Sequence, residues 1–101
     1  MSTSKHQWEN LIRRIAQDTE CVSFSRHALG QMRVRKITLS MALDVLRKGK
    51  IDLEPEVDMK TGHTCCRMER YTAGKAVAMV VACEDEHAPD CIVVTAFVVR
   101  S

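Results

Sequence analysis

The spacing of apolar residues changes near Ile51, and this change constrains the fold more than any other feature of the sequence. Before Ile51, apolar residues recur at every third or fourth position, which is the period of an amphipathic helix. After it come two long apolar runs, over residues 76–83 and 91–99, of the kind found in central strands covered on much of both faces. We therefore predict an α+β domain with N-terminal helices packed on one face of a four-stranded antiparallel meander sheet.

Three helices are expected in the first half of the chain, over residues 4–18, 26–35 and 39–48. In the first of them, Ser4 and Gln7 have the spacing of a capping box. Ser25 and Thr38 suit the N-caps of the other two helices, and Gly49 suits a left-handed C-cap. The apolar side of the first helix is expected to join the core or to form a dimer contact. That side consists of Trp8, Leu11, Ile12 and Ile15.

The second half of the chain is expected to hold the sheet. Its predicted strands cover residues 51–54, 64–71, 76–83 and 91–99, joined by turns at 58–63, 72–74 and 84–90. Pro55 marks the first of them as an edge strand, or marks its end, because proline has no N–H group to donate to the sheet. Residues 21–24 are expected to form a brief strand or an extended linker. One domain is predicted, 1–101, with a helix in 1–20, two helices in 21–49 and the antiparallel sheet in 50–101.

The charges of the chain are distributed unevenly. The net charge is only +2, but residues 1–50 hold ten Lys and Arg against four Asp and Glu, whereas residues 51–101 hold five against nine. This asymmetry permits a basic face for an anionic partner such as RNA. The five cysteines form no Cys-x-x-Cys pair, so reduced thiols and a cytoplasmic protein are predicted. No apolar run approaches the length of a membrane span, so no membrane partner is expected.

The segment 25–38 is where chemistry is predicted. On a helix, positions i, i+4 and i+8 drift by only about 80° around the axis, so His27, Gln31 and Arg35 form one polar stripe. The neighbouring arc is expected to face the core, and it consists of Ala28, Leu29 and Met32. His27, at the margin of that arc, is predicted to be partly buried and to accept a proton. The alternative is that His27 is a structural residue at a core edge and that the arginines form a solvated face.

Two other interpretations are open. Two helices joined at residues 36–38 suggest a helix-turn-helix DNA reader, but the second helix has little free basic surface at its start. A metal or thiol protein could place zinc between Cys83, His87 and Cys91, a spacing that matches no standard ligand pattern. The adjacent Cys65 and Cys66 would point to opposite sides of a strand, which makes joint ligation awkward. We therefore predict no metal and no cofactor.

Several motifs together carry a resemblance to a known family. They are His27-Ala28-Leu29, then Met32, Arg35 and Ile37, a helix that ends in Gly49, and a strand pair that ends in Val94-Thr95-Ala96-Phe97. Over residues 22–99 the chain resembles the bacterial family catalogued as domain of unknown function 4258. Gln31 stands where that family usually has an arginine, and Lys36 stands where it usually has a glycine.

The resemblance carries implications for fold and function, because that family is grouped by similarity with the RelE and barnase-like ribonucleases of toxin–antitoxin systems. It implies a RelE/barnase-like fold with an RNA-cleaving cleft between the motif helix and the sheet, and with RNA and a cognate antitoxin as partners. The resulting prediction is a toxin-like RNA-binding domain or a metal-independent endoribonuclease. The alternative is a non-catalytic protein-interaction module, or a homodimer that uses the first helix and the open sheet face.

Each candidate residue has a role in ribonuclease chemistry. His27 would be the base or acid, Arg35 the bidentate phosphate clamp, and Thr95 a strand-side group that bonds the phosphate or orients His27. The predicted RNA contacts are Arg26, Gln31, Arg33 and Tyr71. Tyr71 would stack on a base or serve as an acid. Thr95 and Tyr71 also have a plain structural interpretation, since both residue types are common in strands.

Overall fold

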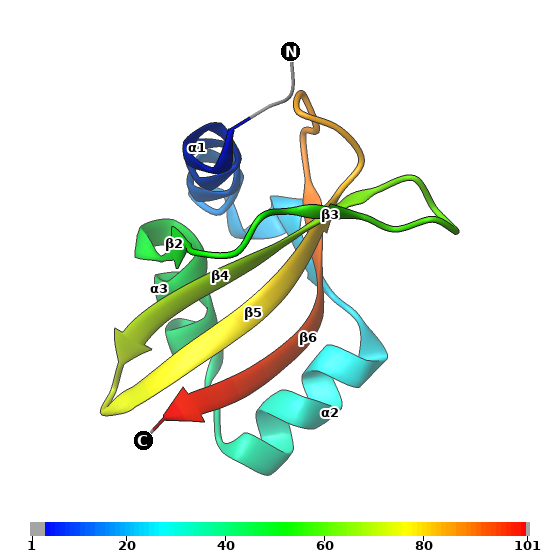
Figure 1. Cartoon of the computed structure of the whole chain (residues 1–101). Helices are drawn as coiled ribbons and strands as arrows, with labels where there is room; N and C mark the ends of the chain where they lie inside the picture. The colour runs from blue at the N-terminus through cyan, green and yellow to red at the C-terminus, as the bar shows by residue number, and fades with distance from the viewer. Residues whose placement is uncertain (1–3, 101) are drawn as a thin grey trace.

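A computed structural model describes residues 4–100 and shows three α-helices that precede most of a sheet (Figure 1). The helices are α1 (Lys5–Ile15), α2 (Arg26–Arg35) and α3 (Leu39–Lys48), with a short 3₁₀ turn, η1 (Thr19–Cys21), between α1 and the first strand. The strands are β1 (Val22–Phe24), β2 (Lys50–Ile51), β3 (Glu56–Val57), β4 (Thr64–Thr72), β5 (Lys75–Cys83) and β6 (Cys91–Arg100). The predicted α+β class is confirmed, and so is the order of its main elements.

The sheet is mixed and has six strands, in the order β1-β6-β5-β4-β2 with β3 also paired to β4. Strands β4, β5 and β6 form the predicted antiparallel meander. However, β1 pairs with β6 in parallel, with Val22 opposite Cys91, so the prediction of a purely antiparallel four-stranded sheet was wrong. Of the predicted first strand, over residues 51–54, only Ile51 lies in a strand, β2. A separate strand, β3, follows Pro55, which cannot donate to a ladder.

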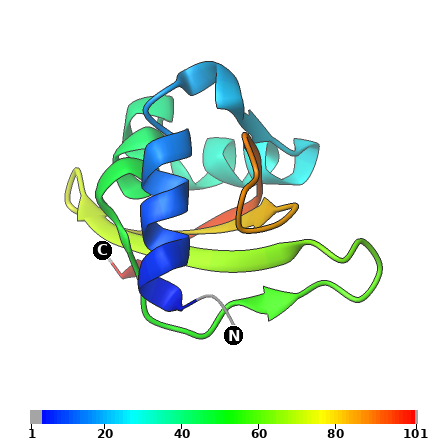
Figure 2. The same ribbon diagram turned by 90° about the horizontal axis from the view of Figure 1, so that it is seen from above.

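The helix layer lies on one face of the sheet (Figure 2). Helix α2 packs along β6, α3 packs over β4 and β5, and α1 rests on α3 beside β2. Under this layer, alternate residues of β5 are buried in the core: Val77, Met79, Val81 and Cys83. The small residues between them in β5 point to the opposite face, which no helix of the described chain covers. The sequence alone had left the choice of face open.

Helix α1 belongs to the core of the domain. All four residues of its apolar side are buried: Trp8, Leu11, Ile12 and Ile15. The helix begins at the predicted capping box, in which the Ser4 Oγ accepts from the Gln7 N–H at 3.2 Å and the Ser4 N–H donates to the Gln7 Oε1 at 2.8 Å. The apolar side is therefore occupied within the chain and does not offer the dimer contact considered from the sequence.

The helix ends show one difference from the prediction. Ser25 and Thr38 cap α2 and α3 as predicted, but the left-handed conformation occurs at Lys36, with φ 58°, and not at Gly49. Gly49 has φ −72° and ψ 175°, which any residue can adopt. Glycine is needed there for space, because a Cβ atom would lie against the Val45 carbonyl oxygen and 2.9 Å from that of Glu69.

Replacing Gly49 with alanine is therefore expected to destabilise the fold by about 1–3 kcal/mol, the usual cost of adding an atom to a packed site. Gly30→Ala is a matched control, because no atom lies within 4 Å of the added Cβ there. Since alanine favours a helix more than glycine does, the control should gain up to about 1 kcal/mol. Urea denaturation followed by circular dichroism measures both. Equal effects of the two substitutions would contradict the steric explanation.

Candidate nucleic-acid interface

Helix α2 is anchored to β6 at its first turn. The Ser25 N–H donates to the Val93 carbonyl at 2.9 Å, and the Ser25 hydroxyl donates to the Val94 carbonyl at 3.1 Å. The same hydroxyl oxygen accepts from the Ala28 N–H at 3.0 Å and so caps the helix. Beyond this anchor α2 follows β6, with Ala28 and Met32 buried in the core. One serine therefore fixes both where the helix starts and how it lies on the strand.

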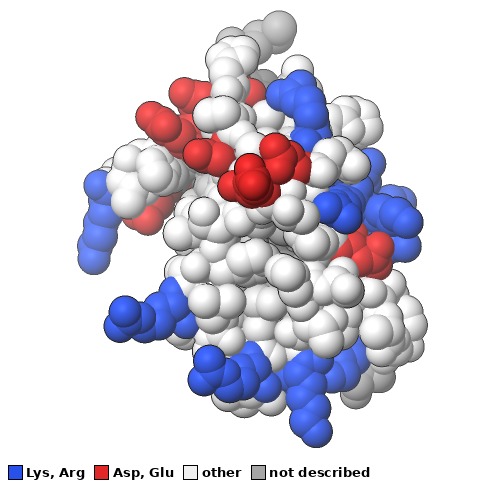
Figure 3. Space-filling view, turned by 180° about the vertical axis from the view of Figure 1, so that it is seen from behind, with Lys and Arg blue, Asp and Glu red and all other residues white. Residues whose placement is uncertain are grey.

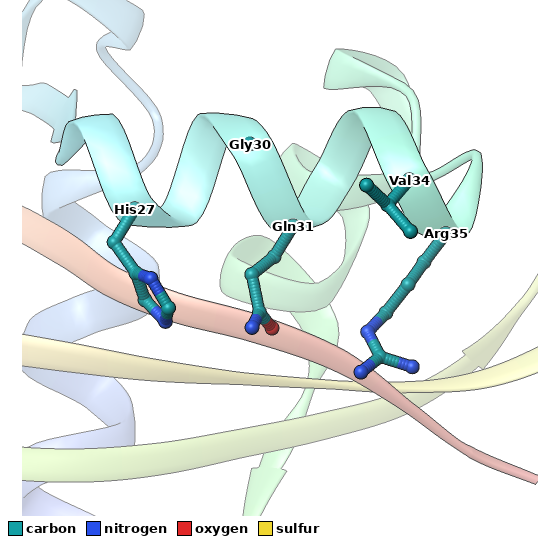
Figure 4. Close-up of a pocket in the computed structure, with 5 residues that line it drawn as sticks. All are labelled: His27, Gly30, Gln31, Val34 and Arg35. Atoms are coloured by element: carbon teal, nitrogen blue, oxygen red, sulfur yellow. The ribbon is translucent and has the colours of Figure 1, made fainter.

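A shallow groove runs along the exposed side of α2. Figure 4 shows that the side chains of His27, Gln31 and Arg35 leave the helix on the same side and extend beside β6. With Gly30 and Val34 they line a hollow of about 350 Å³. Beyond Val93, β6 has no neighbouring strand on this side among the described residues. The predicted stripe thus lines one open groove, which we call the α2 groove.

The α2 groove lies in a segment with only positive charge. Residues 26–38 hold four Lys and Arg and no Asp or Glu. The four cations are Arg26, Arg33, Arg35 and Lys36, and none of them forms a salt bridge within residues 4–100. All four side chains are exposed. These charges are therefore available to an anionic ligand.

Two predictions about burial on α2 were wrong. His27 was expected to be partly buried and is exposed, and Leu29 was expected in the core but is 48% exposed. The reason is that α2 packs along the outermost long strand, so that only a narrow side of the helix is covered. Gln31, whose side chain leaves the helix on the same side as that of His27, is half-buried. The accessible position of His27 favours contact with a ligand over a structural role.

Thr95 lies on the other face of the sheet from α2. It is opposite Val80, whereas Val93, two residues earlier, is opposite Val81, so β6 has a bulge at Val94. Without the bulge, strict alternation would place Thr95 and Val93 on the same face. With it, Val93 faces the core and Thr95 faces the helix-free side. Ser25 donates to the carbonyls of Val93 and Val94 at this same bulge. The bulge is therefore where α2 is anchored and also what turns Thr95 to the helix-free face.

Tyr71 is also separate from the α2 groove. It lies on β4 opposite Ala76, on the helix-free side, and 67% of its surface is exposed. The structure therefore brings together His27, Gln31 and Arg35, with Arg26 and Arg33 exposed on the same helix, but neither Thr95 nor Tyr71 joins them. Helical spacing predicted the first group well. The alternation in a strand says which residues share a face but not which face the helices cover.

The spacing along α2 decides what the groove can do. With a rise of 1.5 Å per residue, the backbones of His27 and Arg35 are about 12 Å apart along the helix axis. Groups at this separation are placed to contact different phosphates of an extended strand more readily than to act together on one phosphate. His27 is the one lining residue of the groove with a side chain suited to proton transfer near neutral pH. The geometry is thus better suited to binding along a strand than to two-group catalysis.

The cysteines form no reactive centre. Burial raises the pKa of the Cys66 thiol to about 12, that of Cys83 to about 11 and that of Cys91 to about 12, so these thiols stay protonated near neutral pH. Within residues 4–100, no three His, Cys, Asp or Glu side chains are grouped as a metal site. The zinc site drawn from Cys83, His87 and Cys91 is therefore not formed. No helix in the same range is long and apolar enough to cross a membrane.

Acidic side chains gather near one end of the molecule. Figure 3 shows them on the upper part of the helix-covered face, whereas the lower edge of that face shows Lys and Arg side chains and no acidic ones; further Lys and Arg side chains lie at the upper right. The loop 84–90 holds four Asp and Glu and no Lys or Arg. Partial burial and then the negative charges of Asp18, Asp90 and Glu20 raise the pKa of the Cys21 thiol, so η1 and this loop belong to the same acidic end. An anionic ligand would be attracted to the other end.

Comparison with known families agrees with the boundaries of this site. The model of the family described as "Domain of unknown function (DUF4258)" matches residues 24–98. The chain belongs to this family. The DUF4258 match begins at Phe24, just before the Ser25 anchor, and contains α2, the groove and nearly all of the sheet, but not α1. None of the curated proteins and none of the solved structures matches the chain. The likeness to the RelE and barnase fold therefore stays a prediction.

Proposed function

We propose that this DUF4258 protein is a toxin-like RNA-binding domain that holds the sugar–phosphate backbone of single-stranded RNA in the α2 groove. The observation that carries the proposal is the stripe of His27, Gln31 and Arg35 in one open groove on a segment that has four cations and no acid. Arg35 offers a planar fork for a phosphate, and Gln31 can both donate to a phosphate and accept from a ribose hydroxyl. Arg26 and Arg33 add charge on the neighbouring turns.

Metal-independent cleavage is a second candidate, favoured by the exposed His27 in the same groove. His27 would take the proton of a ribose 2′-hydroxyl, and the resulting oxygen would attack the adjacent phosphorus. The bond from phosphorus to the 5′-oxygen would break, leaving a 2′,3′-cyclic phosphate, and the 5′-oxygen would receive the proton back from His27. Arg35 would stabilise the charge on the phosphate if its side chain extended back along the groove.

For the protein-interaction alternative, only part of the surface expected from the sequence is available to a partner. The apolar side of α1 is buried in the core, which leaves the helix-free sheet face and the exposed apolar residues of α2. The latter are Leu29 and Val34. A cognate antitoxin or a second copy of the chain at these surfaces remains a proposal, and it predicts a change of molecular mass and no need for RNA.

Replacing Arg35 with glutamine is expected to weaken RNA binding by roughly tenfold, because one charge-assisted contact of about 1.5 kcal/mol is lost. The measurement is fluorescence anisotropy with a labelled single-stranded RNA of about 12 nucleotides, a length within the usual site size of such proteins, at about 50 mM salt, where phosphate contacts are strong. The slope of log affinity against log salt should fall by about 0.7 for the single contact removed.

Arg14→Gln is the matched control, since Arg14 is an exposed residue of α1 and the change in net charge is the same. Its affinity should stay close to that of the wild type. Equal weakening by both substitutions would indicate that only net charge matters, and the α2 groove would lose its assignment. No measurable binding by the wild type at about 50 mM salt would reject the proposed function itself.

A further inference from the structure

A second hollow lies at the β2 edge of the sheet. It has a volume of about 310 Å³ and is lined by residues of α3, β2, β4 and β5, among them Lys48, Lys50, Tyr71 and Ala76. Tyr71 and Ala76 are opposite each other on adjacent strands, so the large ring of Tyr71 has only a methyl group as its cross-strand neighbour. This leaves an exposed aromatic ring beside two lysines. We call it the Tyr71 hollow.

The charges around the Tyr71 hollow leave its lysines available. Its other lining cation, Arg70, donates to Asp44 at 2.9 Å, and this contact is the main cause that lowers the pKa of Asp44. The Glu69 carboxylate, which also lines the hollow, is 3.1 Å from the Arg67 Nε. Neither Lys48 nor Lys50 forms a salt bridge within the described chain. Of the two carboxylates that line the hollow, only that of Asp52 forms no salt bridge within the described chain. The hollow therefore has two lysines but one carboxylate that are not paired in this way.

The two hollows are connected by the β4–β5 hairpin. The Lys75 Nζ donates to the Arg35 carbonyl at 3.1 Å, which ties the last residue of α2 to the start of β5. Lys75 is the first residue of the strand that carries Ala76 in the wall of the Tyr71 hollow. The turn between the strands is Ala73-Gly74, both with positive φ, and it presents no bulky side chain.

We propose that the Tyr71 hollow is a second subsite for the same single-stranded RNA, where a base stacks on the Tyr71 ring and its phosphate lies beside Lys48 and Lys50. The inference rests on the proposed RNA binding in the α2 groove, and it adds a path for the strand around the β4–β5 hairpin. Aromatic rings next to cations are the usual platform for single-stranded nucleic acid, because every base has a face that can stack. The subsite therefore selects unpaired RNA without selecting a sequence.

The test compares RNAs of about 4 and about 12 nucleotides, which span the range of site sizes for single-strand binders. In the wild type, the longer RNA should bind more tightly because it reaches both subsites. Tyr71→Ala should remove much of this gain, with a loss of about 5- to 100-fold for the longer RNA. Tyr71→Phe retains the ring and should bind like the wild type. Lys50→Gln should weaken binding of the longer RNA, whereas Lys60→Gln, at an exposed position in the turn before β4, should not.

The outcomes distinguish a failure of the second subsite from a failure of the proposed RNA binding on which it rests. If Tyr71→Ala binds the longer RNA like the wild type while Arg35→Gln still weakens it, the second subsite is rejected and the α2 groove stands. If Tyr71→Phe loses as much affinity as Tyr71→Ala, the hydroxyl and not the ring makes the contact, and the stacking subsite is also rejected. If neither RNA binds the wild type, the proposed function fails first. Tyr71 is largely exposed, so its variants should fold normally, and circular dichroism verifies this.

Discussion

Replacing His27 with alanine is expected to reduce RNA cleavage by about 100- to 10,000-fold, the usual contribution of a side chain that transfers a proton in the reaction. RNA affinity should change far less, because His27 supplies one contact among several in the α2 groove. The experiment incubates purified protein with a mixed single-stranded RNA in the absence of added metal. It scores both the rate of cleavage and the formation of 2′,3′-cyclic phosphate ends.

His6→Ala is the control for this experiment, because His6 is exposed on α1 and lies outside the groove. Cleavage by the wild type and by His6→Ala, but not by His27→Ala, would assign proton transfer to His27. Cleavage by all three proteins would show that His27 does not transfer the proton. Binding without cleavage by any of them would leave an RNA-binding domain, as the geometry of the groove favours.

Because His27 and Arg35 are separated along α2, RNA binding and RNA cleavage have to be measured separately. About 12 Å of helix axis lies between their backbones, and the two predicted strand-side partners face the other side of the sheet. In this arrangement His27 would have to give its proton back to the leaving oxygen by itself. A catalytic DUF4258 protein would therefore depend on one histidine for both proton transfers. Loss of that histidine should therefore remove the one proton-transferring side chain among the lining residues of the groove.

Local signals in the sequence predicted α2 and its stripe accurately. A helix repeats with a fixed period, so the common side of His27, Gln31 and Arg35 follows from their spacing alone. The Ser25 cap is equally local, since its hydroxyl reaches an N–H three residues away. The helix end was less predictable. Lys36 takes the left-handed conformation there, which is strained for a residue with a side chain. The one signal for it is that the family usually has a glycine at this position, the residue type that favours a left-handed cap.

Features that depend on distant contacts could not be predicted. The strand β1 has three residues, too few for a periodic pattern, and its parallel pairing arises because the helices carry the chain from one edge of the sheet to the other. The bulge at Val94 turns Thr95 away from α2, yet the run 91–99 is apolar throughout its first half and shows no break there. A single inserted residue reverses the face of every residue after it. For this reason Thr95 does not line the groove that contains His27.

Replacing Trp8 with alanine is expected to lower the free energy of unfolding by about 3–5 kcal/mol, a large fraction of the stability of a domain of this size. Trp8 is 6% exposed and packs in the same core as the buried residues of α3 and β5. Although α1 lies outside the DUF4258 match, this core is incomplete without it. Urea denaturation followed by circular dichroism gives the change in stability.

The same variant distinguishes a core helix from a dimer contact. If α1 closes the core, Trp8→Ala should lower stability and leave the molecular mass measured by light scattering unchanged. Asn10→Ala, at an exposed position of the same helix, should change stability by no more than about 0.5 kcal/mol. A normal stability of Trp8→Ala together with a changed mass would mean that Trp8 packs against another copy. The burial of all four apolar residues of α1 within one chain argues for the first result.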